Sequence, residues 1–398
     1  MSTPSSADCA ERNARHLLPV YGRNEVAFVR GAGTELWDAE GRRVLDFFSS
    51  ILCTNLGHCH PAVTEAIREQ AGTLVHLSNL QHSLPQTRLA ELLVENSFAE
   101  KVFLCNSGAE ANEAAIKLAR RWGHARGGRF EVLTALGSFH GRTMATIAAT
   151  GQEKVRIGFE PSLPGFRYVP FGDAEAMAES VGPQTAAILV EPIQGEGGVV
   201  VPPENYLHDL RRLCDERDLL LMYDEVQTGC GRTGKLFAYE HSGAVPDVMT
   251  LAKGIANGMP AGAMCAGARA AGGFETGSHG STFGGNCVTN AAAVATLETL
   301  LDGRTLPRAR EAGARLRRGL AEIAASHPQL AREVRGEGLL LGVDMKDAET
   351  AQAVCGRALD AGLLINVAGG RVLRIAPPIN VSDAEIDEGL GLLKKAMQ

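Results

Sequence analysis

Apolar and polar positions follow two different rhythms along this chain, and each rhythm predicts a different kind of element. Between about residues 100 and 270, short apolar runs recur, and each run is bounded by polar or glycine-rich turns. Such runs are typical of strands that are buried on both faces. The stretches between them are longer and place apolar residues at helical spacing. The predicted strands are VFLC, FEVLT, FRYVP, AAILV, LLLMY, VMTLA and AMCA.

Strands that alternate with helices predict an α/β fold whose mainly parallel sheet is covered by helices. Residues 288–325 read as a helix that is interrupted near Asp302 and Gly303, and short strands mixed with helices follow it. This change of pattern predicts a smaller α+β domain at the C-terminal end. Near the N-terminus, LWDAEGRRVLDF predicts a strand, a turn and a strand that pack on this small domain. We therefore expect an N-terminal segment at 1–55, a large domain at 56–287 and a small domain at 288–398.

Composition narrows the class of protein. The 398 residues suffice for roughly two domains of ~150 residues, and 45% of them are hydrophobic. A net charge of −7 argues against a nucleic-acid partner. Apolar runs are too short for a membrane span, and the N-terminus lacks the pattern of a secretion signal. Nine scattered cysteines fit reduced thiols, so we expect a cytoplasmic protein. His58-Cys59-His60 lacks the spacing of a metal site, so no metal is expected.

Lys253 and Asp224 are the first candidates for catalysis. Asp224 follows the apolar run LLLMY, and Lys253 follows the run VMTLA. Open α/β sheets bind ligands at the carboxyl ends of their strands, so both side chains are expected at one crevice. A lysine amine that forms a Schiff base and an aspartate that holds a ring nitrogen are what pyridoxal 5'-phosphate (PLP) requires. Alternatively, this aspartate caps a turn and this lysine is a solvated surface charge.

The segment CNSGAEANEAAIKLARRW predicts a helix with an anion site at its start. Its apolar residues lie at helical spacing, and Ser107 with Glu110 forms a capping-box pattern. Because a helix N-terminus offers free backbone N–H groups, a phosphate could bind at Gly108 and Ala109. An ordinary capped helix would show the same pattern.

Six ordered motifs together resemble the class III (ornithine-type) PLP-dependent aminotransferases of fold type I. The resemblance runs from about Tyr21 to Pro378. Within this family, the chain is most similar to the enzymes that transaminate N-acetylornithine. The motifs are NSGAEANEAAIKLAR, FHGRT, EPIQGEGGV, DEVQTGCGRTGK, TLAKG and STFGGN.

The resemblance implies a role for each residue of the cofactor site. Lys253 would form the Schiff base with PLP and later move a proton, and Asp224 would keep the ring nitrogen protonated. Phe139 and Val226 would cover the two faces of the ring, although plain core packing is the alternative for both. Thr282 would reach the phosphate of a partner subunit, which implies a homodimer with a shared active site. The remaining cofactor contacts implied are Ser107, Gly108, Ala109, Glu225 and Gln227.

The resemblance also implies how substrates are recognised. Arg142 and Arg374 would bind carboxylates, because a guanidinium donates two parallel hydrogen bonds to a carboxylate. Glu196 would pair with Arg374 when the donor has no nearby carboxylate, and would move away for glutamate. Tyr21 would lie near the distal carboxylate, and Ser281 near an acyl-ornithine. The implied reaction moves the ω-amino group of N2-acetyl-L-ornithine to 2-oxoglutarate.

Several alternatives stay open at this stage. N-succinylornithine, N-succinyl-diaminopimelate, ornithine and 4-aminobutyrate are other possible donors, and the chain departs from the family pattern at Ser50, at Gln81 and after Lys253. A PLP aminomutase would need no 2-oxoglutarate. A PLP-fold binding protein would not need Lys253. A nicotinamide dehydrogenase would need a GxGxxG motif after its first strand, which the sequence lacks.

Overall fold

A seven-stranded sheet forms the centre of the large domain in the computed structural model, which describes residues 4–398. Its strands lie in the order β4-β10-β9-β8-β7-β5-β6. The pairs from β9 to β6 are parallel, and only β10 runs antiparallel to its two neighbours. All seven predicted strands are therefore confirmed, as is the mainly parallel sheet. The strands are β4 (Lys101–Cys105), β5 (Glu131–Ala135), β6 (Phe166–Val169), β7 (Thr185–Val190), β8 (Leu220–Asp224), β9 (Val248–Leu251) and β10 (Gly262–Ala266).

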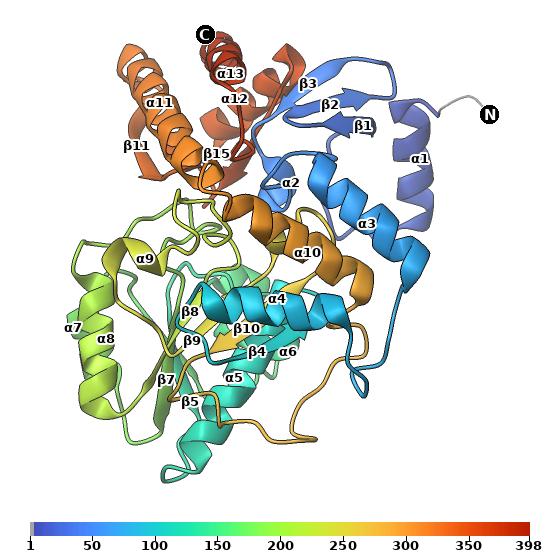
Figure 1. The fold of residues 1–398 in the computed structure, drawn as a ribbon. Coiled ribbons are helices and arrows are strands. Elements are labelled where there is room, and N and C mark those ends of the chain that lie inside the picture. Colours follow the sequence, from blue (N-terminus) through green and yellow to red (C-terminus); the bar gives the residue numbers. More distant parts are fainter. Residues whose placement is uncertain (1–3) are drawn as a thin grey trace.

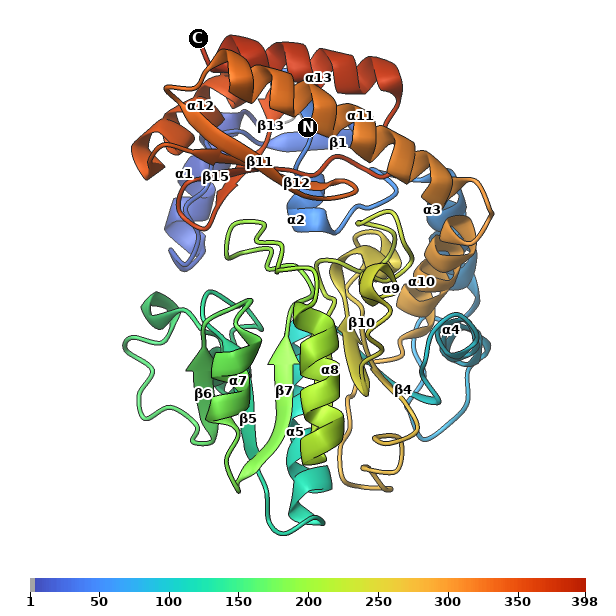
Figure 2. The ribbon, with the colours of Figure 1, turned by 90° about the vertical axis from the view of Figure 1, so that its left-hand side faces the viewer.

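Helices cover both faces of this sheet (Figure 2), which explains why the central strands are apolar throughout. The helix α5 packs on one face, and α7 and α8 pack on the other. The helices α3 and α4 pack against α10 beside the sheet. Their bounds are α3 (Pro61–Thr73), α4 (Leu84–Glu95), α5 (Gly108–His124), α6 (Met144–Ala149), α7 (Ala174–Ser180), α8 (Tyr206–Arg217), α9 (Tyr239–Ser242) and α10 (Cys287–Leu300), with 3-10 turns η1 (Glu153–Val155) and η2 (Lys253–Ala256).

Two smaller sheets lie together above the large sheet (Figure 1). Strand β3 from the N-terminal segment pairs in parallel with β13 near the C-terminus, as expected for the N-terminal hairpin. The predicted helix break is also present, between α10 and α11. The first small sheet contains β1 (Phe28–Ala32), β2 (Glu35–Asp38), β3 (Arg43–Asp46) and β13 (Leu363–Leu364), and the second contains β11 (Ala331–Glu337), β12 (Leu340–Met345), β15 (Val372–Ile375) and β14 (Asn366–Ala368). The accompanying helices are α1 (Ser6–His16), α2 (Ser49–Leu52), α11 (Thr305–Ser326), α12 (Ala348–Ala361) and α13 (Asp383–Ala396).

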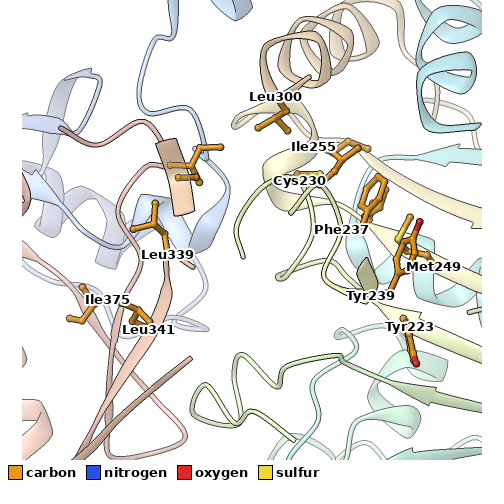
Figure 3. Packing of buried hydrophobic residues seen from close by; sticks show 14 of the residues in the cluster. Tyr223, Cys230, Phe237, Tyr239, Met249, Ile255, Leu300, Leu339, Leu341 and Ile375 are labelled. Atoms are coloured by element: carbon orange, nitrogen blue, oxygen red, sulfur yellow. The ribbon is translucent and has the colours of Figure 1, made fainter. Parts of the chain in front are cut away.

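One hydrophobic cluster continues from the large sheet into the small domain. Figure 3 shows Tyr223 and Met249 on the large-domain side and Leu341 and Ile375 on the small-domain side. This shared core fixes the carboxyl ends of β8 and β9 beneath the small-domain sheet. Within residues 4–398, no helix is long and apolar enough to cross a membrane.

Candidate active site

A cavity of about 450 Å³ brings Lys253 and Asp224 together. Asp224 is the last residue of β8, and Lys253 lies two residues beyond the end of β9. The two strands are parallel neighbours, so their carboxyl ends open on the same crevice. Lys253 has a φ of +44°, a left-handed conformation that is uncommon for a residue with a side chain. Gly254 follows it, and a Cβ at this position would lie 2.2 Å from Nδ2 of Asn55.

Asp224 is held by two polar side chains that the sequence analysis did not identify. Asn112 donates from Nδ2 to Oδ2 of Asp224 at 2.8 Å, and Nδ1 of His140 lies 2.8 Å from the same oxygen. Both residues are buried, and the backbone N–H of Val226 binds the other carboxylate oxygen at 3.0 Å. The aspartate is therefore fixed in orientation. A possible signal for Asn112 was its position as a polar residue among alanines on the buried face of α5.

The N-terminus of α5 lines the same cavity through Ser107, Gly108 and Ala109. Ser107 caps the helix by accepting the backbone N–H of Glu110 at 3.2 Å. The predicted capping box is wrong in its second half, because the Glu110 carboxylate accepts from Asn106 at 2.9 Å and not from Ser107. Asn106 offers two donors to this carboxylate, its backbone N–H and its amide, whereas Ser107 would offer one.

Phe139, Val226 and Gln227 also line the cavity. A Cβ on Gly108 would lie 2.8 Å from Cγ1 of Val226, so a glycine is needed for this close approach. The Phe139 backbone N–H donates to Glu191 at 3.1 Å. Glu191 is not among the residues predicted from the sequence, and it is buried where it lines the same cavity. Burial raises its pKa well above the usual range, and the nearby Asp224 carboxylate acts in the same direction.

Glu196 and Arg374 form an ion pair beside the cavity, with Nη1 and Oε1 2.6 Å apart. The Arg374 side chain is 1% exposed and also donates to Oε1 of Gln227 at 2.7 Å and Oδ1 of Asn366 at 3.1 Å. Burial by itself would raise the pKa of Glu196, but Arg374, Lys253 and Gln227 together outweigh burial and lower this pKa to about 2. The carboxylate is therefore charged at neutral pH. The pair matches the expected partners of the two-substrate switch.

The Lys253 amine lies close enough to this pair for its charge to be affected. Burial lowers the pKa of Lys253, and the Glu196 carboxylate only partly opposes this effect. A lowered pKa increases the fraction of neutral amine, which is the nucleophilic form. The thiol of Cys53 lines the cavity near Lys253, and burial raises its pKa.

Arg142 is exposed at the mouth of the cavity, with its guanidinium carbon 5.5 Å from the centre of the Phe139 ring. Two segments that depart from the family pattern also reach this region. In the first, Ser50 and Ile51 adopt left-handed backbone conformations, and Cys53, two residues after Ile51, lines the cavity. In the second, residues 258–261 line the cavity wall. Gln81 does not line it.

Glu225 is not brought to the cavity, although it follows Asp224 directly. Its carboxylate accepts the backbone N–H groups of Ala238 at 2.6 Å and Tyr239 at 2.8 Å, and the hydroxyl of Thr228 at 3.0 Å. Burial raises the pKa of Glu225 to about 7. Because consecutive residues point in opposite directions at a strand end, the side chain after Asp224 turns into the protein and caps a loop.

Tyr21, Ser281 and Thr282 also lie outside this cavity. Tyr21 is 72% exposed. Ser281 and Thr282 line a second cavity of about 1080 Å³ beside α4 and β4. Ser281 shares a hydrogen bond of 3.2 Å with Asn106, which lines the first cavity.

The residues of the first cavity fit PLP. A lysine amine can bond to an aldehyde, a fixed carboxylate can hold a ring N–H, and the start of α5 offers backbone N–H groups to a phosphate. All of these groups face one space.

Comparison with known proteins gives consistent results. The family described as Aminotransferase class-III matches residues 20–397. The acetylornithine aminotransferase of Gloeobacter violaceus is 50% identical, with 96% of this chain and 95% of the relative covered. The acetylornithine aminotransferase of Caldanaerobacter subterraneus is 48% identical, with coverages of 95% and 96%. A solved ornithine aminotransferase from Toxoplasma gondii, with PLP partially occupying its active site, is 32% identical with a TM-score of 0.94, covering 98% of this chain and 94% of that one.

Proposed function

Because this chain belongs to the class III aminotransferases, we propose that it transfers the ω-amino group of N2-acetyl-L-ornithine to 2-oxoglutarate. The products are N-acetyl-L-glutamate 5-semialdehyde and L-glutamate, a step of arginine biosynthesis. The enzyme is a PLP-dependent transaminase. The single observation that carries the proposal is the Glu196–Arg374 pair at 2.6 Å beside Lys253, because a reversible counter-charge lets one site accept two different substrates. Relatives with that activity support the choice of donor.

In this proposal, PLP supplies an electron-withdrawing ring that stabilises negative charge on the carbon that loses its proton. Nζ of Lys253 holds the cofactor between turnovers and then moves a proton as general base and acid. Asp224 keeps the ring nitrogen protonated, and its hydrogen bonds from Asn112 and His140 keep the carboxylate oriented for this task. Gln227, which lines the cavity, would donate to the phenolic oxygen of the bound cofactor.

Phe139 and Val226 would cover the two faces of the ring, and the start of α5 at Ser107, Gly108 and Ala109 would hold the phosphate. These assignments rest on the placement of all five residues around the one cavity. Glu225 is left out of the set, because its carboxylate binds backbone N–H groups away from the cavity.

Substrate carboxylates bind to the two arginines in our proposal. Arg142 stands at the cavity mouth and takes the carboxylate far from the reacting amine. Arg374 takes the α-carboxylate of glutamate after Glu196 turns away. For the acyl-ornithine, whose ω-carbon carries no carboxylate, Glu196 stays paired and Arg374 remains neutralised. Tyr21 and Ser281 are proposed as further substrate contacts.

The active site is shared between two subunits in our proposal. Thr282 is exposed and does not line its own chain's cofactor cavity, so it is free to reach the phosphate site of a second copy. Large apolar side chains are exposed around the second cavity, including Leu80 at 89% and Phe283 at 61%, which favours an interface there. Sedimentation velocity tests this surface: Leu80→Asp should shift a dimer towards monomer, whereas Val245→Asp, on another surface, should not.

We also propose a cytoplasmic location, because all nine cysteines are free thiols. The division into parts at 1–55, 56–287 and 288–398 is likewise proposed, supported by the separate sheets on either side of these boundaries.

A panel of half-reactions tests the proposed donor. The purified enzyme is mixed with N2-acetyl-L-ornithine, N-succinylornithine, N-succinyl-diaminopimelate, ornithine and 4-aminobutyrate in turn, and the cofactor absorbance is followed. N2-acetyl-L-ornithine should give the highest kcat/KM, and a higher value for any other amine would overturn the assignment.

Reductive trapping tests the anchoring lysine. Borohydride treatment followed by peptide mapping should place the cofactor on Lys253. The Lys253→Ala protein should retain no covalent cofactor and show no turnover. Attachment at another residue would refute the proposed chemistry.

A further inference from the structure

The loop that carries Glu196 belongs to the large domain, but its backbone is bound by the small domain. This loop joins β7 to α8 and rises from the large sheet towards the small-domain strands (Figure 2). Arg335 on β11 donates from Nη2 to the carbonyl of Gly198 at 2.9 Å and from Nε to the carbonyls of Gly198 and Val199, each at 3.1 Å. One guanidinium therefore binds two consecutive carbonyls of the loop.

A second contact, between two backbones, binds the same loop at Glu196 itself. The N–H of Gly369, in the turn between β14 and β15, donates to the carbonyl of Glu196 at 3.0 Å. A Cβ on Gly369 would lie 2.5 Å from the carbonyl oxygen of Gly197, so the two backbones touch. The side chain of Val199 is fully buried in a cluster with Val372 and other small-domain residues.

The loop holds a strained conformation at the place where Arg335 binds. Val199 has a φ of +52°, in the left-handed region. This region is disfavoured for a β-branched residue, whose branched Cβ crowds the backbone there. Such a conformation persists only where its surroundings determine it strongly. The carbonyls of Gly198 and Val199 point towards Arg335 in this strained turn, so the guanidinium is well placed to maintain it.

Arg335 itself is well anchored. Its Nη1 lies 2.7 Å from Oε1 of Glu333 on the same strand and 3.5 Å from Oδ2 of Asp344 on β12. Arg374 projects from β15, which pairs with β12, and β12 pairs with β11. The arginine that binds the loop and the arginine that pairs with Glu196 therefore extend from one continuous sheet. The position of the Glu196 loop and the position of Arg374 are therefore both set by this one sheet.

We infer that Arg335 is a positioning residue that sets the selectivity between the two substrates. It holds the loop backbone so that only the Glu196 side chain has to move, and it keeps the carboxylate within reach of Arg374. This inference rests on the proposed function. Loss of Arg335 would weaken the Glu196–Arg374 pair without removing either charge. Arg374 would then be more available to the α-carboxylate of glutamate.

The test compares half-reactions in Arg335→Gln, in Arg335→Lys and in a control, Arg332→Gln. Arg332 lies on the same strand, but its Nη2 donates to the backbone carbonyl of Lys346 at 2.7 Å, within the small domain. In Arg335→Gln, the ratio of kcat/KM for glutamate to that for the ω-amine should rise roughly three- to tenfold, a size typical of coupled neighbours. Arg335→Lys keeps one cationic donor and should restore part of the original ratio. The control should keep the wild-type ratio.

A double-mutant cycle identifies the route of the effect. In the Glu196→Gln background, where the pair is already broken, Arg335→Gln should leave the ratio unchanged. The inference would be overturned if Arg335→Gln lowered both half-reactions equally. It would also be overturned if Arg335→Gln changed the ratio as much in the Glu196→Gln background as in the wild type.

A second readout does not depend on activity or on the bound cofactor. Hydrogen–deuterium exchange of the apo-protein should become faster in residues 194–200 of Arg335→Gln, while Arg332→Gln keeps the wild-type rate. Unchanged exchange in this loop would overturn the inference even if the proposed donor is correct. If wild-type enzyme fails to accept N2-acetyl-L-ornithine but the loop exchange responds, the proposed donor is wrong and the positioning role stands.

Discussion

Neutralising Glu196 should favour one half-reaction over the other. In the free wild-type enzyme, Arg374 is paired with Glu196, and glutamate must replace this partner by its own α-carboxylate. In Glu196→Gln, no pair has to be broken before glutamate binds. An ω-amine brings no carboxylate to Arg374 when it binds. The cost of breaking the Glu196–Arg374 pair therefore does not enter the kcat/KM for the ω-amine. We therefore expect a rise in kcat/KM for glutamate and little change for N2-acetyl-L-ornithine.

The structure sets the size of this effect. Removing one partner of a buried ion pair costs about 3–5 kcal/mol. Glu196 is 29% exposed, and Arg374 keeps the neutral acceptors Gln227 and Asn366, so a cost of about 1.5–3 kcal/mol is expected. At about 1.4 kcal/mol per tenfold, this predicts a rise in kcat/KM for glutamate of roughly 10- to 150-fold. The free energy of unfolding should fall by a similar amount.

Stopped-flow absorbance of the cofactor measures both half-reactions, and urea titration measures the free energy of unfolding. Glu388→Gln is a matched control, because it neutralises one partner of an exposed pair with Arg43. Exposed pairs contribute about 0–1 kcal/mol, so this variant should leave both half-reactions unchanged. Equal changes in the two half-reactions of Glu196→Gln would refute the assignment of Glu196 as the switch.

Three further predictions follow from local contacts. Gly254→Ala should destabilise the protein by about 1–3 kcal/mol in urea unfolding, because its Cβ would lie 2.2 Å from Nδ2 of Asn55; an unchanged midpoint would contradict this. Asn112→Leu removes a donor to Asp224 at 2.8 Å and should raise the Kd for PLP roughly tenfold in a fluorescence titration, so an unaltered Kd would exclude this role. The pKa of Glu196 is lowered from 4.5 to about 2, so the stability that this carboxylate contributes should be present above about pH 4.5 and lost as the pH falls towards 2. Urea unfolding across this range should therefore show wild type and Glu196→Gln converging in acid.

Local patterns predicted the elements and the chemically reactive residues of the cofactor site. A strand buried on both faces needs an unbroken apolar run, so β7 and β8 could be recognised from their own residues. The chain direction then places Asp224 and Lys253 at the same edge of a parallel sheet. Ser107 at the start of α5 follows the rules for capping, which involve only neighbouring residues.

Contacts between distant segments decided the rest. Asn112 and His140 meet at Asp224 only because α5 and the loop after β5 pack on the same end of the sheet, and no local pattern records this. Orientation at a loop is equally non-local: Glu225 binds N–H groups from a later turn and so faces away from the cavity. The near-complete burial of Arg374, which makes its counter-charge valuable, depends on contacts of this small-domain residue with Glu196 and Gln227 from loops of the large domain. The sequence by itself therefore determined which groups are available, since strand and helix formation depend on short segments. The tertiary structure decided which groups touch and how strongly, because burial and ion-pair distance are properties of segments brought together from the whole chain.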